Sequence, residues 1–245
     1  LTDGVYGLLG RYYFGNNANI WLWGLYGNNE AKGLETYATK TNTPELGGRV
    51  QVPLFNGELA VSFHERMVMD NPLLMRPWTV PDFQEYRVGL DGKWDVGVGL
   101  WFESSVQYGD KGTIANGLGY NNWDAMFTLG VDYTFSVGSG LTAMVEYFGY
   151  NNSPQLFKKG TYVHLLGGML TYPFSINDNV SAMLYYSINT NDLIAYGMYG
   201  HTWDKFSLYV IVFSSPANVS LPMYSGNGNA LYSGTGVQLM GVYYF

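Results

Sequence analysis

Charged residues make up only 13% of this chain, and those best placed for chemistry form one basic and one acidic group. The basic group is Arg49, Arg66 and Arg87, and the acidic group is Glu103, Asp124 and Glu146. Two such groups on opposite walls of an aqueous pore create a transverse field that orients and selects polar solutes. The alternative is that the same side chains pair with one another and fill the interior, as matched ion pairs do in small barrels.

The later part of the chain offers a second kind of wall, which carries aromatic rings and methionines instead of charges. We expect its lumen-facing rings to be Tyr185, Tyr199, Tyr209 and Phe213. Such a surface suits sugar rings or other partly apolar solutes, since aromatic faces are amphipathic. Two other interpretations remain open: a plug or partner protein covers this wall, or the wall carries hydrophobic compounds.

The sequence gives little support for catalysis, metal binding or nucleic-acid binding. Ser62 and His64 share a face of one predicted strand, but no carboxylate or amide is clearly placed to orient the ring, so we expect no enzyme. The chain has no Cys, and no two of its 3 His stand at ligand spacing, so we predict neither a metal site nor a cofactor. A net charge of −7 argues against nucleic acid as a partner.

The elements that must position these residues are predicted to be membrane-crossing β-strands. In residues 121–135, one face carries Trp123, apolar residues and then Tyr133 and Phe135, while the other face carries residues such as Asp124 and Asp132. An apolar face with an aromatic at each end is typical of a strand that crosses a bilayer. Strands with one apolar and one polar face also explain a mean hydropathy near zero in a chain with 17% aromatics.

The same alternation predicts thirteen strands, most of them long enough to cross a bilayer at a tilt. No stretch approaches the roughly 18 apolar residues that a membrane-spanning helix needs. We therefore expect one domain over residues 1–245, an all-β, antiparallel, up-and-down transmembrane barrel of about 12–14 strands; a soluble β-sandwich is the alternative. The predicted strands cover 5–14, 19–27, 46–54, 58–67, 83–95, 96–108, 121–135, 141–150, 162–174, 179–189, 193–203, 206–215 and 234–245.

The predicted connections alternate between short and long, which sets the orientation of the barrel. Longer connections cover 28–45, 68–82, 109–120, 151–160 and 216–233, and long loops belong to the outside of a bacterial barrel. Because bacterial barrels close with an even number of strands, thirteen is one too few or one too many. We expect at least one strand, or a plug, upstream of Leu1; the alternative is twelve strands, with one segment wrongly split or added.

The last nine residues, VQLMGVYYF, place Leu239, Tyr243 and Phe245 on one face and end on Phe. This pattern resembles the closing strand of the bacterial outer-membrane β-barrels of the porin-like superfamily, without pointing to one family. The resemblance implies an outer-membrane location and identifies these three residues as the signal that the barrel assembly machinery recognises. It also implies outer-membrane lipid and lipopolysaccharide as partners. We therefore expect a passive channel for small polar or amphipathic solutes, with a structural or partner-housing barrel as the alternative.

Overall fold

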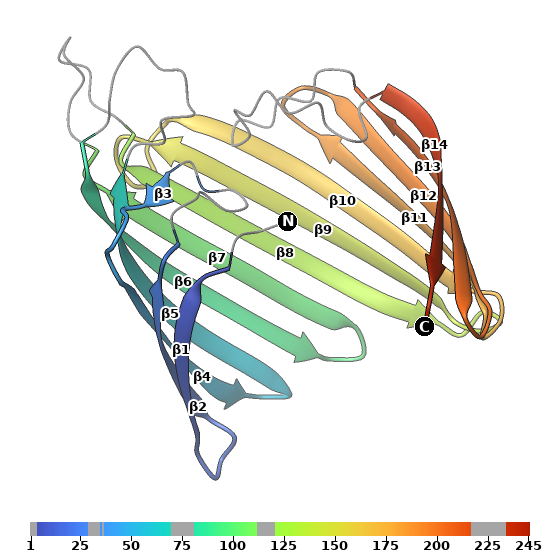
Figure 1. Cartoon of the computed structure of the whole chain (residues 1–245), viewed down its shortest axis with the longest axis horizontal. Helices are drawn as coiled ribbons and strands as arrows, with labels where there is room; N and C mark the ends of the chain where they lie inside the picture. The colour runs from blue at the N-terminus through green and yellow to red at the C-terminus, as the bar shows by residue number, and fades with distance from the viewer. Residues whose placement is uncertain (1–3, 29–34, 36, 70–80, 112–120, 217–233) are drawn as a thin grey trace.

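The computed structural model describes residues 4–28, 35, 37–69, 81–111, 121–216 and 234–245, and these residues form one antiparallel β-sheet (Figure 1). Thirteen strands follow one another in chain order from β1 to β14, and the short β3 lies off this path and pairs with β5. The predicted all-β, up-and-down architecture is thus confirmed. No helix long and apolar enough to cross a membrane is found among the described residues.

The strands are longest in the middle of the sheet and shortest at its first edge. Each predicted strand corresponds to one strand of the path, with its ends within a few residues of the predicted ones. Their bounds are β1 (Tyr6–Tyr13), β2 (Asn19–Tyr26), β3 (Ala38–Thr39), β4 (Glu45–Leu54), β5 (Gly57–Met69), β6 (Phe83–Asp95), β7 (Gly99–Gly109), β8 (Trp123–Phe135), β9 (Leu141–Ser153), β10 (Thr161–Pro173), β11 (Asp178–Ser187), β12 (Asp192–Thr202), β13 (Phe206–Ser215) and β14 (Gly234–Tyr243).

Six short turns lie at one end of the sheet, which we call the turn end. The other end, the loop end, carries the longer connections and one four-residue turn, 188–191. The turn end carries residues 14–18, 55–56, 96–98, 136–140, 174–177 and 203–205. Several of these tight turns require a left-handed backbone, as at Gly97 with φ 91°. The predicted connections 68–82, 109–120 and 216–233 lie for the most part outside the described residues.

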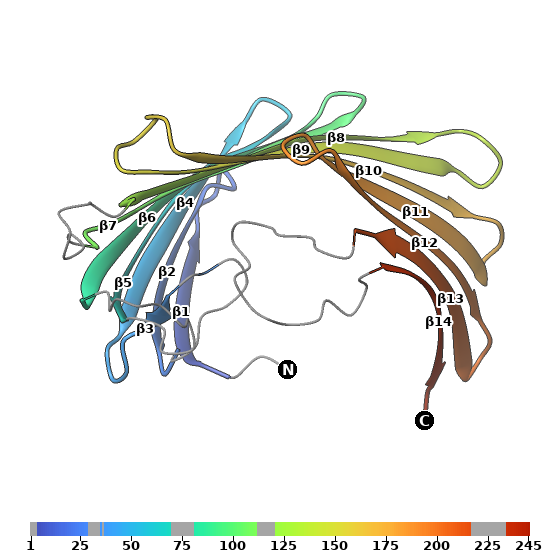
Figure 2. The same cartoon turned by 90° about the horizontal axis from the view of Figure 1, so that it is seen from above.

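The sheet is strongly curved, and its two edge strands β1 and β14 face each other across an opening (Figure 2). No hydrogen-bonded ladder joins these two strands in the described part of the chain, so the sheet is open along this side. Because every neighbouring pair on the thirteen-strand path is antiparallel, β1 and β14 run in the same direction.

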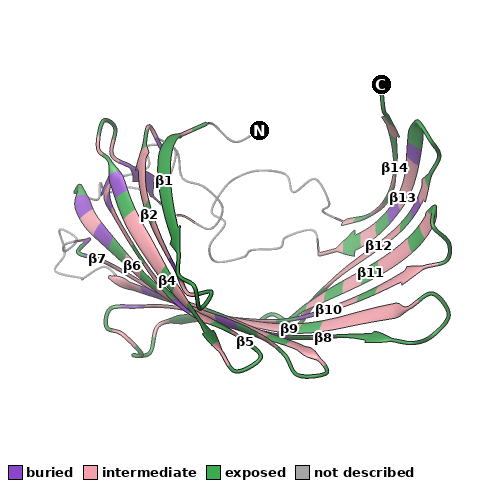
Figure 3. Cartoon of the chain, turned by 90° about the horizontal axis from the view of Figure 1, so that it is seen from below, coloured by how far each residue is buried: buried purple, intermediate pink, exposed green. Residues whose placement is uncertain are grey.

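The sequence alternation gives this sheet two chemically different faces. Side chains from β2 to β9 line a common cavity of about 640 Å³, so we call the face that carries them the concave face. The opposite, convex face carries exposed apolar side chains such as Leu22, Leu46, Leu129 and Leu184. Buried residues are few and scattered (Figure 3), and a buried apolar cluster of Tyr37, Val68 and Phe83 lies at the loop end.

Candidate functional site

The pairing register places the six charged residues singled out from the sequence on the concave face. Arg49 pairs with Ser62, and Arg87 pairs with His64 and Gln107. The ladder continues with Gln107 opposite Asp124 on β8 and Glu103 opposite Asp91 on β6. Arg66 lies opposite Glu85. Glu146 lies opposite Gly130, which is an even number of residues from Asp124 on β8 and therefore shares its face. Since residues of equal parity share a face of a sheet, all six project to one side.

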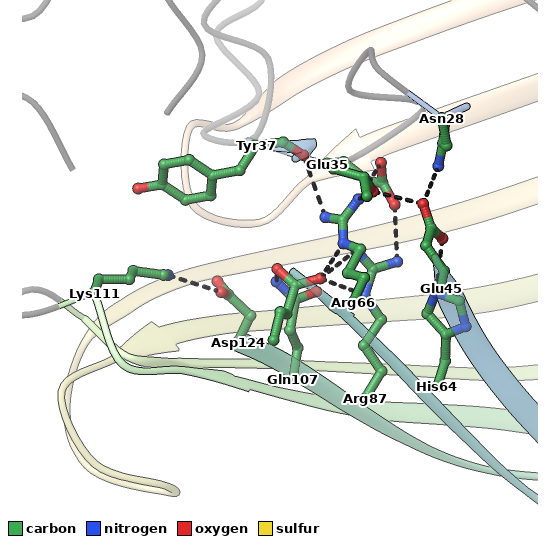
Figure 4. A network of polar contacts seen from close by, with 12 residues as sticks. Asn28, Glu35, Tyr37, Glu45, His64, Arg66, Arg87, Gln107, Lys111 and Asp124 are labelled. Atoms are coloured by element: carbon green, nitrogen blue, oxygen red, sulfur yellow. Dashed lines mark hydrogen bonds and ion pairs between the residues drawn. The ribbon is translucent and has the colours of Figure 1, made fainter. Parts of the chain in front are cut away.

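The arginines near the loop end are held in a buried network of matched charges (Figure 4). Arg66 is 1% exposed and donates from Nε to Glu85 Oε1 at 2.6 Å and from Nη1 to Glu35 Oε2 at 3.0 Å. Arg87 also binds both carboxylates, Glu85 Oε1 at 2.6 Å and Glu35 Oε1 at 2.9 Å. Gln107 donates to the second oxygen of Glu85. Two guanidinium groups therefore neutralise two carboxylates, which is the condition for burying such charges.

Glu35 and residues 37–39, which lie between β2 and β4, supply part of this network and lie over the concave face at the loop end. Glu35 and the carbonyl oxygen of Tyr37 accept hydrogen bonds from Arg66, and β3 pairs with β5 through Ala38 and Thr39. The sequence predicted only an outer connection over 28–45. This part of the prediction was incomplete, because an irregular segment shows no periodicity from which its docking onto a sheet could be read.

A chain of hydrogen bonds connects Trp23, His64 and Glu45 beside this network. Trp23 Nε1 donates to His64 Nδ1 at 3.1 Å, and His64 Nε2 lies 3.0 Å from Glu45 Oε2. Because an indole nitrogen only donates, Nδ1 must accept, which assigns the proton of the neutral ring to Nε2 and directs it at Glu45. Glu45 also accepts from Thr39 and Asn28. Both nitrogens of His64 are thus engaged, and neither is left to serve Ser62 as a base.

The remaining charged candidates differ in whether they have an oppositely charged partner. Arg49 binds Asp91 through both terminal nitrogens, at 2.5 and 2.6 Å. Asp124 binds Lys111 at 3.3 Å and also accepts hydrogen bonds from Tyr150 and Asn152. The arginines therefore pair with acids other than the three expected to face them. Glu103 and Glu146 form no salt bridge within the part of the chain that the structure describes.

Aromatic rings on the concave face lie against glycines of neighbouring strands. A Cβ built on Gly130 would lie 2.0 Å from the ring of Trp101, and one on Gly47 would lie 2.3 Å from the ring of Trp23. Each ring therefore occupies the space that a side chain at the glycine would need, and lies along the wall instead of projecting into the interior. Tyr185, Tyr209 and Phe213 cover Gly167, Gly200 and Gly236 in the same way.

Tyr199 requires a correction, because it lies on the convex face and not on the aromatic wall. It pairs with Val180 on one side and Val210 on the other, whereas its neighbour Met198 pairs with Ser181 and Ile211. Its side chain is 41% exposed, and its hydroxyl donates to Asp178 at 2.6 Å. The strand β12 has large apolar or aromatic residues on both faces, so alternation alone could not assign its faces.

The residues of the predicted C-terminal signal are exposed: Leu239 and Tyr243 on the convex face, and Phe245 just beyond β14. No group of three or more His, Cys, Asp or Glu side chains suited to a metal ion occurs among the described residues. Comparison with known proteins found no matching family model, no matching curated protein and no matching solved structure. The site must therefore be interpreted from its own geometry.

Proposed function

We propose that this sheet is the wall of a transmembrane β-barrel of the bacterial outer membrane, which forms a channel for small polar or amphipathic solutes. The observation that carries the proposal is the contrast between the two faces of one curved sheet. The convex face exposes aliphatic side chains such as Leu46, Leu129 and Leu170, which suit contact with lipid. The concave face is charged and hollow, with the cavity of about 640 Å³ lined by Arg49, Arg87 and Glu103 among others.

The bilayer itself supplies the reason for closure. Each free edge, at β1 and at β14, presents a row of unpaired backbone N–H and C=O groups. Every such group costs several kcal/mol in hydrocarbon, so an open edge is strongly disfavoured there. The location rests on the terminal residues Leu239, Tyr243 and Phe245, which would be read by the barrel assembly machinery, with lipid and lipopolysaccharide around the finished barrel.

A filled or partner-housing barrel is the second candidate, and one specific contact favours it. The segment with Glu35 and Tyr37 lies over the concave face and is bound there by Arg66 and Arg87. Such a cover narrows the interior at the loop end. Whether ions pass beside it decides between the two candidates.

Conductance of the purified, refolded protein in planar lipid bilayers tests the proposal. We expect discrete, steady open steps for the wild type, and larger steps for Arg66→Ala, since that change removes the hydrogen bonds from Arg66 to Glu35, Tyr37 and Thr39 and so loosens the covering segment. Far-ultraviolet circular dichroism must show β-structure in both proteins, so that a misfolded protein is not mistaken for a folded barrel that does not conduct. A folded wild type that never conducts refutes the channel, and conductance in Arg66→Ala alone identifies a barrel filled by this segment.

A further inference from the structure

The basic side chains of the concave face are largely neutralised by neighbouring carboxylates. Arg66 and Arg87 share Glu35 and Glu85, and Arg49 is bound at both terminal nitrogens by Asp91. A guanidinium held in this way contributes little net field at a distance, because its partner's charge cancels it. The arginines therefore cannot form the positive wall that the sequence suggested.

The acidic side chains of the same face are not neutralised to the same extent. Glu103 on β7, Asp132 on β8 and Glu146 on β9 form no salt bridge in the described part of the chain. Register places Glu103 opposite Thr128 and Glu146 opposite Gly130, so these carboxylates lie on three neighbouring strands of the same wall.

A cavity shows that part of this acidic surface is open to the interior. Glu103, Asp132 and Glu58 line a hollow of about 370 Å³ together with Asp91, the partner of Arg49. Lys93 is the only basic residue among the residues that line it. The other described base of the concave face without a carboxylate partner, Arg11, stacks over the ring of Trp21 on β2, with its Cζ 4.1 Å from the ring centroid.

We infer that the channel is selective for cations, and that Glu103, Asp132 and Glu146 determine this selectivity. The inference rests on the proposed function and deepens it by assigning the charge of the preferred solute. The selectivity arises from the electric field of these unneutralised carboxylates along one wall, and it requires no bound ion.

Coulomb's law gives the size of the effect. Three carboxylates at about 8 Å from a permeating ion in water, screened by about 0.1 M salt, concentrate monovalent cations about threefold and deplete anions about threefold. The ratio of cation to anion permeability is then about tenfold, and it falls toward one at about 1 M salt, where the screening length is about 3 Å.

The experiment measures reversal potentials in planar bilayers under a KCl gradient for the wild type and for the combined variant Glu103→Gln, Asp132→Asn, Glu146→Gln. We expect the ratio of K⁺ to Cl⁻ permeability to fall from about ten to near one in the variant. Glu65→Gln is the matched control, because Glu65 pairs with Leu46 and Tyr86 on the convex face, and its loss should leave the ratio unchanged. Lys93→Gln should raise the ratio. If the combined variant does not fold, Glu146→Gln alone serves as the test, and we expect it to lower the permeability ratio by about twofold.

The outcomes separate the two proposals. A conducting wild type without preference for K⁺, or a ratio that Glu65→Gln lowers as much as the lumen variants do, overturns the selectivity and leaves the channel standing. A folded wild type that stays silent overturns the proposed function, and this inference with it.

Discussion

Arg66 connects the sheet to the segment that covers it, so replacing it with methionine tests the buried network directly. The guanidinium donates to Glu85, Glu35, the carbonyl oxygen of Tyr37 and Thr39, at 2.6, 3.0, 3.2 and 3.4 Å. Breaking a buried ion pair from one side typically destabilises by about 3–5 kcal/mol. Arg87 still contacts both carboxylates in the variant, so we expect a loss near the lower end, about 3 kcal/mol.

The assay is urea unfolding of the protein refolded in detergent micelles, followed by tryptophan fluorescence and extrapolated linearly to zero urea. Arg11→Met is the matched control, because Arg11 lies on the same face but is exposed and stacks on Trp21. Its loss should cost less than about 1 kcal/mol. Equal destabilisation by the two variants, within about 0.5 kcal/mol, would show that the buried network adds no more stability than the exposed Arg11, and would refute the reasoning.

Two further predictions concern the wall and the edges of the sheet. Gly130→Ala should displace the ring of Trp101 into the interior, shift the tryptophan fluorescence and destabilise the protein by about 1–3 kcal/mol. In the control Gly10→Ala, the added methyl group meets no atom closer than 4.0 Å, so the fluorescence should not shift. Similar spectra for both variants would contradict the ring placement. Closure of the sheet would bring β1 beside β14, and a disulfide needs Cα atoms within about 7 Å. In the 245-residue chain reconstituted by itself in bilayers, a cysteine replacing Leu8 on β1 should therefore form an intramolecular disulfide with one of a series of cysteines placed along β14. The absence of native Cys makes the result unambiguous, and a disulfide-linked dimer on a non-reducing gel would argue against closure within one chain.

The strands were predictable because the sequence repeats one simple contrast along most of its length. In the segment 121–135, every second residue from Trp123 to Phe135 is apolar and the residues between them are polar except Met126 and Gly130, and the structure has β8 at Trp123–Phe135. Short turns rich in Gly and Asn separate such segments, which fixed the path of the sheet. β3 could not be predicted, because two residues show no periodicity, and its pairing with β5 depends on tertiary contacts.

The candidate site was less predictable, because alternation determines the face of a residue but not its partner. Arg66 and Arg87 could be assigned to one face, yet nothing in the sequence indicated that Glu35 would reach both of them. Glu85 left a signal, since it lies two residues before Arg87 and hence shares its face. Tyr199 was misassigned because both faces of β12 are apolar or aromatic, so its alternation has no polarity contrast.

The unequal lengths of the strands have a consequence for the membrane around the proposed barrel. A strand of 13 residues such as β8 rises by about 33 Å along the membrane normal at a tilt of about 40°, whereas the 8 residues of β1 or β2 rise by only about 20 Å. Lipid beside β1 and β2 must thin to match the shorter wall, or the longer strands must project beyond the headgroups at the loop end. In both cases, the seam between β1 and β14 would lie where the strands are shortest and the hydrophobic mismatch is greatest.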